Sequence, residues 1–189
     1  MLPTLHKQKG ALRKSIYAVV RELDNIKEQS RTVTAKVLLL PEFQNCTRIL
    51  KSILEIGNKS LFVPKVTRDG AMEFLKVENQ NDLDALPSGK WGIREPSYES
   101  DAGPRVNAME VGLDLILVPG VAFDRSMSRL GHGKGYYDRY IARYIASGRP
   151  RPLLVALALR EQLLDSTIPF GEHDCKMDMI ITPEEVIHR

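Results

Sequence analysis

The apolar positions at the start of the chain predict helices. They recur three or four residues apart, a spacing typical of an amphipathic helix with one buried face. The positions are Leu12, Ile16, Val19, Val20 and Leu23. A second helix is predicted over residues 32–43, and a third over 48–55 that ends at the cap pattern of Gly57 and Asn58. A short helical turn is expected over 82–86.

Short apolar runs between polar segments predict strands. The runs cover residues 60–66, 72–77, 115–118, 153–159 and 179–181. A helical period returns over 137–145, and a short helix is expected near Arg160. Because helices and apolar strands alternate, the sequence predicts an α/β fold, with an open, mainly parallel sheet flanked by helices in a Rossmann-like three-layer arrangement. At 189 residues we expect a single domain over residues 1–189.

Composition narrows the class of protein. The net charge of +3 is too small to indicate nucleic-acid binding by itself, and no apolar run approaches the ~20 residues that cross a bilayer. The two cysteines, Cys46 and Cys175, match no metal or redox spacing, so we expect free thiols in a reducing compartment. The expectation is a cytoplasmic monomer that binds neither nucleic acid nor membrane.

The first predicted helix is basic, with no acidic residue before Glu22. Lys9 and Arg13 lie four residues apart and share a face, where like charges repel by a few tenths of a kcal/mol. Three interpretations stay open: a solvated basic face, a clamp for a polyanion, or an amphipathic mitochondrial targeting helix. Targeting helices are usually rich in serine, whereas this segment carries only Ser15.

A glycine cluster, Gly131 to Gly135, lies between the apolar run at 115–118 and the helical pattern that follows. Strand, glycine loop and helix in this order build phosphate sites, because glycines let the backbone approach an anion and the helix N-terminus is partially positive. Lys134 adds a full positive charge. The cluster is not a Walker A loop, since Ser128 replaces its first glycine, nor a dinucleotide fingerprint, since Tyr136 replaces the third. A purely structural turn is the alternative.

Two further features carry candidate chemistry. Asp138 falls in the first turn of the helix after the glycines, where it can hold Mg²⁺ on a bound polyphosphate, and Asp174 or Asp178 can supply a second carboxylate. The alternative for Asp138 is a helix N-terminal acid that favours the dipole. Trp91 lies in a long polar loop, residues 87–112. Its interpretation stays open between a lid or stacking surface and a lone aromatic packed on the core.

Several motifs together resemble those of the 5-formyltetrahydrofolate cyclo-ligase family, also called methenyltetrahydrofolate synthetases. The segment RLGHGKGYYDRY at 129–140, preceded by DLILVPGVAFD, is similar to the family signature. Four other segments match as well: Lys9 to Arg13 (K-x-x-L-R), Phe62-Val63-Pro64, Trp91 to Pro96 (W-x-I-x-E-P), and His173-Asp174 with Asp178. The resemblance extends over nearly the whole chain.

The resemblance implies an ATP- and Mg²⁺-dependent cyclisation of 5-formyltetrahydrofolate to 5,10-methenyltetrahydrofolate, giving ADP and phosphate. It implies ATP contacts from Lys9, Arg13, Arg129, Leu130, Gly131, His132, Gly133, Lys134, Gly135, Tyr136 and Tyr137. Lys134 and Tyr136 become the catalytic candidates, and the folate side is expected at Trp91, Tyr136 and Tyr137. Asp138 and Asp174 become the Mg²⁺ ligands. The basic face of the first helix then belongs to the ATP site.

One segment departs from the family pattern. Family members carry a strand and a loop, roughly S-x-P-x-x-x-E-x-x-T, before the helix that leads to FVP, whereas here Thr47-Arg48-Ile49 runs directly into Leu50. The gap after residue 49 is on the order of 15 residues, about one strand and one loop. A missing strand leaves backbone groups unpaired, so we expect reduced stability and a damaged folate pocket.

Two alternatives to an active cyclo-ligase follow. The first is a catalytically weak or inactive relative, from a splice or gene-model variant, that retains nucleotide binding. The second is a basic nucleic-acid-binding module, although the chain carries no RNA-binding motif.

Overall fold

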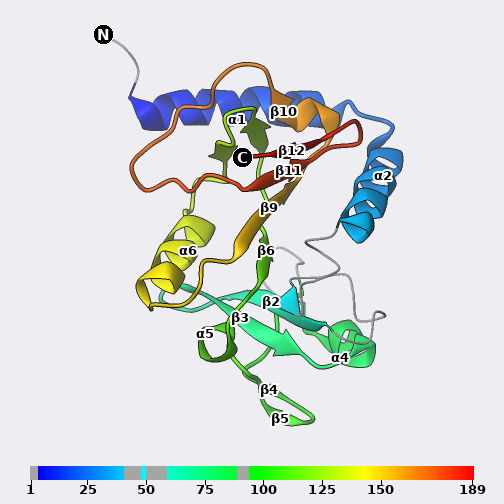
Figure 1. The fold of residues 1–189 in the computed structure, drawn as a ribbon, viewed down its shortest axis with the longest axis vertical. Coiled ribbons are helices and arrows are strands. Elements are labelled where there is room, and N and C mark those ends of the chain that lie inside the picture. The colour runs from blue at the N-terminus through cyan, green and yellow to red at the C-terminus, as the bar shows by residue number, and fades with distance from the viewer. Residues whose placement is uncertain (1–3, 41–47, 50–58, 89–93) are drawn as a thin grey trace. The chain divides into compact units, whose positions relative to one another are not determined.

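A computed structural model describes residues 4–40, 48–49, 59–88 and 94–189 (Figure 1). The chain forms two compact units, each built from separate stretches of sequence. The first unit comprises residues 1–44, 117–138 and 153–189, and the second comprises 45–116 and 139–152. Among the described helices, none combines the length and the apolar character that crossing a bilayer requires.

Two helices open the first unit, α1 (Leu5–Arg21) and α2 (Ile26–Leu39). Ile16 of α1 is buried against a cluster that includes Leu130 and Ile168. On α2 the buried polar residue is Gln29, whose amide oxygen accepts the N–H of Arg160 at 2.8 Å. Its amide nitrogen donates to Asn25 and Glu161 at 2.9 and 3.1 Å, so a buried polar side chain is fully paired and fixes α2 in the unit.

The strands of the first unit are short and pair in both senses. They are β6 (Leu115–Leu117), which crosses the boundary of the units, β7 (Ala122–Asp124), β8 (Arg129–Leu130), β9 (Leu153–Leu157), β10 (Leu163–Leu164), β11 (Met179–Ile181) and β12 (Val186–His188). One sheet has the order β12-β11-β9-β6, with β9 and β11 parallel and β12 antiparallel, as Figure 1 shows for β9, β11 and β12. The other has the order β10-β7-β8, and a 3₁₀ turn (Arg160–Gln162) precedes β10.

The second unit centres on the sheet β1-β2-β3. Its elements are β1 (Arg48–Ile49), β2 (Ser60–Val66), β3 (Met72–Val77), α4 (Gln80–Ala85), β4 (Glu99–Ser100), β5 (Gly103–Pro104), α5 (Ala108–Val111) and most of α6 (Tyr136–Ala146). Two tyrosines of α6 are buried here. Tyr140 meets Phe74 edge to face at 4.5 Å between ring centroids, and the Tyr144 hydroxyl accepts the Leu113 N–H at 2.6 Å.

The predicted α/β class is confirmed, and the parallel and antiparallel pairs make the sheets mixed rather than mainly parallel. The predicted strands 60–66, 72–77 and 179–181 match β2, β3 and β11 residue for residue. The predicted third helix is wrong at its start, because the backbone of Arg48 and Ile49 pairs in parallel with β2. Its other residues, 50–55, lie outside the described residues. One domain over the whole chain stays a prediction.

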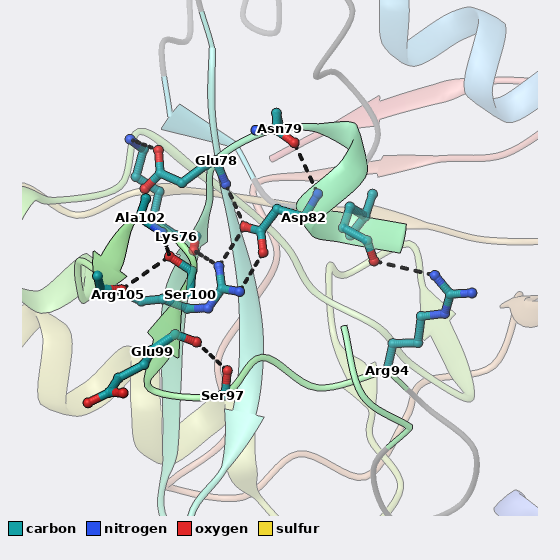
Figure 2. A network of polar contacts seen from close by, with 12 residues as sticks. Lys76, Glu78, Asn79, Asp82, Arg94, Ser97, Glu99, Ser100, Ala102 and Arg105 are labelled. Atoms are coloured by element: carbon teal, nitrogen blue, oxygen red, sulfur yellow. Dashed lines mark hydrogen bonds and ion pairs between the residues drawn. The ribbon is translucent and has the colours of Figure 1, made fainter. Parts of the chain in front are cut away.

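A polar cavity of about 330 Å³ lies in the second unit, between α4 and the β4–β5 hairpin. Figure 2 shows Arg105 and Asp82 pointing toward each other at this place. The two Nη atoms of Arg105 donate to the two carboxylate oxygens of Asp82 at 2.6 and 2.5 Å, and Nη1 also donates to the Lys76 carbonyl at 2.9 Å. The Arg105 side chain is 3% exposed, so this ion pair is buried.

We predict that Asp82→Ala lowers the free energy of unfolding by about 3–5 kcal/mol at neutral pH, because it leaves a buried guanidinium without its carboxylate. The Arg105 hydrogen bonds hold the pKa of Asp82 below its ordinary value of 3.8. The stability that this ion pair contributes is therefore fully present above the pKa of Asp82 in the unfolded chain. It is lost as pH falls through the lower pKa of Asp82 in the folded chain. Urea unfolding at neutral and at strongly acidic pH measures both effects.

The matched control is Asp84→Ala, whose partner Arg94 is 3.6 Å away on an exposed surface. Exposed pairs contribute about 0–1 kcal/mol, so this variant should unfold close to wild type. Equal losses in the Asp82 and Asp84 variants would contradict the assignment.

Candidate active site

The glycine loop connects β8 to α6 within a few residues. A buried carboxylate, Asp124, fixes the turn before β8, because its Oδ1 accepts the N–H groups of Ser126 and Ser128 at 2.9 and 3.0 Å. Its Oδ2 accepts the Ile168 N–H at 2.7 Å. Burial alone would raise the pKa of Asp124, but these donors outweigh it and lower the pKa. The turn thus sets where β8 ends and the glycines begin.

Two glycines of the loop cannot be replaced without strain. Gly133 has a φ of 94°, a left-handed conformation, and an added Cβ would lie 3.4 Å from the guanidinium carbon of Arg13. An added Cβ at Gly131 would come within 2.8 Å of Arg129 Nη1. The backbone of the loop therefore lies directly against two arginines.

Helix α1 presents a stripe of side chains, spaced by four residues, to this loop. Lys9 forms an ion pair with Asp174, and Arg13 Nε donates to the Gly131 carbonyl at 2.7 Å. One turn further, the Tyr17 ring lies 6.3 Å from the His132 ring between centroids. The basic face of the first helix is thus folded onto the glycine loop.

The two carboxylates predicted to bind the metal are both close to Cys175: Asp174 precedes it in the chain, and Asp138 accepts its N–H. Both oxygens of Asp138 accept from Arg129 Nη2 at 2.8 and 2.7 Å, and Oδ1 also accepts the Cys175 N–H at 3.3 Å. Asp174 Oδ2 accepts from Lys9 and from the Gly171 N–H, the latter at 2.7 Å. Both carboxylates are largely buried, and each faces a cation of the chain.

The electrostatic field of the loop is positive. The His132 side chain is exposed, but desolvation by the atoms packed around it, and then the positive charges of Arg129 and Arg13, lower its pKa from the ordinary 6.5. Burial raises the pKa of Tyr137 to about 12, so this tyrosine is a neutral phenol at physiological pH. Lys9, Arg13 and Arg129 thus lie around the loop that carries Lys134, and their positive charges favour an anion there.

The donors suit a Mg²⁺ ion that is held mainly by a bound phosphate. Within the described ranges no group of three or more His, Cys, Asp or Glu side chains is arranged to hold a metal ion. Mg²⁺ often takes only one or two carboxylates and completes its shell with phosphate oxygens and water. Asp138 and Asp174 supply that number, and Cys175, next to Asp174 in the chain, donates its N–H to Asp138.

The structure brings together most of the residues that the sequence predicted for the site. Lys9, Arg13, the segment 129–138 and Asp174 all belong to the first unit. Asp178, the alternative second carboxylate, accepts the Leu154 N–H at 2.8 Å and thereby anchors β9. Trp91, predicted on the folate side, lies outside the described residues, so its role stays a prediction.

Sequence reasoning missed the backbone N–H groups of Gly171 and Cys175 and the ring of Tyr17. Tyr17 could have been found, because it continues the four-residue spacing of Lys9 and Arg13. The two N–H groups could not, since nothing in their side chains marks a backbone donor.

A strand, a glycine loop, a helix and nearby cations define an α/β protein whose glycine loop is suited to an anion. Comparison with known proteins defines the group further: the chain belongs to the 5-formyltetrahydrofolate cyclo-ligase family, whose model matches residues 5–183.

Individual relatives support the same conclusion. A probable 5-formyltetrahydrofolate cyclo-ligase of Schizosaccharomyces pombe is 37% identical over 183 residues, covering 86% of this chain and 87% of the relative. The 5-formyltetrahydrofolate cyclo-ligase of mouse (Mus musculus) is 32% identical, and the match covers 94% of this chain and 95% of the relative. The solved 5,10-methenyltetrahydrofolate synthetase of Aquifex aeolicus superposes with a TM-score of 0.70 at 30% identity, over 95% of this chain and 92% of that one.

We predict that His132→Gln flattens the pH dependence of stability in mild acid. A folded-state pKa below 6.5 means that the unfolded chain binds more protons there, so the stability present above pH 6.5 is lost as pH falls. The variant cannot titrate and should lose less stability than wild type between neutral and mildly acidic pH. Urea midpoints across that range provide the measurement. His6→Gln, at an exposed position of α1, is the control, and parallel curves for wild type and His132→Gln would refute the prediction.

Proposed function

We propose that this chain catalyses the ATP-dependent cyclisation of 5-formyltetrahydrofolate to 5,10-methenyltetrahydrofolate, with ADP and phosphate as products. Membership of the cyclo-ligase family supports the reaction. The observation that carries the mechanism is the convergence of Lys9 and Arg13 of α1 on the glycine loop and the 171–175 turn. These groups come from distant parts of the sequence and form one cationic site.

The chemistry requires such a site. The formyl oxygen attacks the γ-phosphorus of ATP, and ADP leaves. N10 of the folate then attacks the activated formyl carbon and loses its proton, and phosphate departs as the ring closes. In the first step negative charge spreads over the phosphoryl oxygens, so catalysis depends on cations and fixed N–H donors around them.

Each part of the site has a proposed role. Lys9, Arg13 and Lys134 neutralise phosphate charge, and the backbone of 129–137 wraps the triphosphate. Tyr136 and Tyr137 face the folate, and the raised pKa of Tyr137 keeps it a neutral hydrogen-bonding group. Asp138 and Asp174 would hold Mg²⁺, which supplies Lewis-acid neutralisation of the phosphate oxygens when bound.

Binding of the nucleotide requires an exchange of partners on the protein. In the structure Lys9 pairs with Asp174. A polyphosphate offers Lys9 a more highly charged partner, and Asp174 is then open to a cation of the ligand complex. The ion pair therefore holds both side chains in place before the substrate arrives.

The second candidate is a weak or inactive family member that retains nucleotide binding. The described residues hold only a two-residue strand, Arg48–Ile49, at the point where the sequence departs from the family pattern. Restoring a family-like strand and loop after residue 49 should raise the thermal midpoint and the turnover rate. Equal midpoints and equal turnover with and without the segment would dismiss this second candidate.

The proposal extends to the cellular setting and to the partners of the chain. We infer a cytoplasmic monomer whose partners are small molecules, with neither nucleic acid nor membrane among them. A relative in Arabidopsis thaliana is named a mitochondrial 5-formyltetrahydrofolate cyclo-ligase, at 29% identity over 98% of this chain. A mitochondrial location is therefore the alternative, and fractionation of cells that express the chain distinguishes the two.

We predict that Lys134→Ala lowers kcat/KM for ATP by about 100-fold or more, as expected when a fixed charge at a developing phosphoryl charge is removed. The assay mixes protein, 5-formyltetrahydrofolate, ATP and Mg²⁺ and follows the absorbance of the methenyl product. The control is Lys7→Ala, an exposed lysine of α1 outside the site. An active wild type with an unimpaired Lys134→Ala variant would overturn the role given to the glycine loop.

A further inference from the structure

The ammonium of Lys176, two residues after Asp174, is bound to the turn that joins β7 to β8 (residues 124–128, the β7–β8 turn). Lys176 Nζ donates to the Ser126 carbonyl at 2.7 Å and to the hydroxyls of Ser126 and Ser128 at 2.9 and 2.7 Å. A lysine ammonium carries three N–H donors, and these three oxygens match that number. The side chain therefore joins the segment that carries Asp174 to the β7–β8 turn.

The β7–β8 turn is held in place by bonds of its own. The buried Asp124 carboxylate accepts the N–H groups of Ser126 and Ser128, and also the Ser126 hydroxyl at 2.8 Å. Met127 is 3% exposed and has a φ of 66°, a left-handed conformation that side chains rarely adopt. Such a strained residue persists only where its surroundings determine the conformation. The turn therefore offers oxygens in fixed positions to the segment bound against it.

Two further contacts tie the segment of Asp174 at this point. The Met177 N–H donates to the Met127 carbonyl at 2.9 Å, next to the bonds that Lys176 makes. Lys176 Nζ also lies 4.6 Å from the centroid of the Phe170 ring, a cation–π contact that holds these two side chains together. Asp174 lies between Phe170 and Lys176 in the chain, so this contact closes a short loop, the 170–176 loop, around it.

The 170–176 loop defines where the Asp174 carboxylate lies. Within it, Asp174 Oδ2 accepts the Gly171 N–H at 2.7 Å, and the Asp174 N–H donates to the Gly171 carbonyl at 3.1 Å. The same carboxylate also pairs with Lys9. In the proposed function Lys9 passes to the phosphates when the nucleotide binds. The bonds of the loop then keep the carboxylate in position, because its cationic partner has left it.

We propose that Lys176 is a positioning residue, which fixes the 170–176 loop on the β7–β8 turn and thereby holds Asp174 ready for the cation of a Mg²⁺–nucleotide complex. The proposal rests on the proposed function, because it assigns Lys176 a task within the same nucleotide site. Lys176 acts through Asp174, since its own donors are used on the turn. Residues that orient a metal ligand typically contribute about 10–100-fold to metal affinity.

The test is calorimetric binding of ADP to the full chain, first with a chelator and then with Mg²⁺. Lys176→Met removes the ammonium but keeps an unbranched side chain beside Phe170. In chelator this variant should bind ADP within about threefold of wild type. With Mg²⁺ it should bind about tenfold or more weakly than wild type. Lys176→Arg, which keeps N–H donors for the same oxygens, should recover part of the lost affinity. Equal losses for Lys176→Met in chelator and with Mg²⁺ would overturn the proposal.

A double-mutant cycle separates a positioning role from a general loss of stability. Asp174→Asn removes the metal ligand, so adding Lys176→Met to it should change the affinity with Mg²⁺ by less than about threefold. The matched control is Lys65→Met in the second unit, which should bind ADP like wild type in both conditions. Lys65 also donates to a carbonyl, that of Pro96 at 2.7 Å, and lies 5.2 Å from the centroid of the Tyr98 ring.

The remaining outcomes distinguish this inference from the proposed function. A loss on Lys176→Met that persists in full in the Asp174→Asn background, or an equal loss in the Lys65 variant, would overturn the inference alone. A wild type that binds ADP without any gain from Mg²⁺ would overturn the metal role of Asp174 and this inference with it. Absence of ADP binding by wild type would instead overturn the proposed function.

Discussion

The contact of α1 with the glycine loop and the 171–175 turn is the constraint on which the candidate site depends. Lys9 reaches Asp174 across 165 residues of sequence, and Arg13 reaches the Gly131 carbonyl across 118. Only when the first helix lies over the loop do its cations and the helix N-terminus of α6 act on the same place.

Two kinds of ion pair, buried and less buried, have different effects in this site. The buried pair of Arg129 and Asp138 sets geometry, because Arg129 Nη2 donates to both oxygens of the Asp138 carboxylate. The less buried pair of Lys9 and Asp174 holds two charged side chains in place, and a bound ligand can replace either partner. The same principle recurs in the second unit, where the buried Arg105–Asp82 pair joins the β4–β5 hairpin to α4.

Much of this arrangement could be predicted from the sequence. β2 and β3 are mostly apolar segments, and Gly131 to Gly135 mark the loop, so local patterns sufficed there. The strands β7, β8 and β12 have only two or three residues, too few for a period to emerge. The partners of Arg129 were beyond sequence reasoning for a different reason: nothing in the sequence pairs this side chain with the Pro119 carbonyl or with Asp138, which packing brings to it.

Hydrogen–deuterium exchange of the whole chain, with and without ADP, tests the central claim most directly. The account predicts that ADP slows amide exchange together in three separate segments, the first turns of α1, residues 131–138 and residues 171–175. It predicts no change in the β4–β5 hairpin, which belongs to the second unit. Protection limited to one of the three segments, or found only in the second unit, would contradict the assembly of the site from α1, the glycine loop and the 171–175 turn.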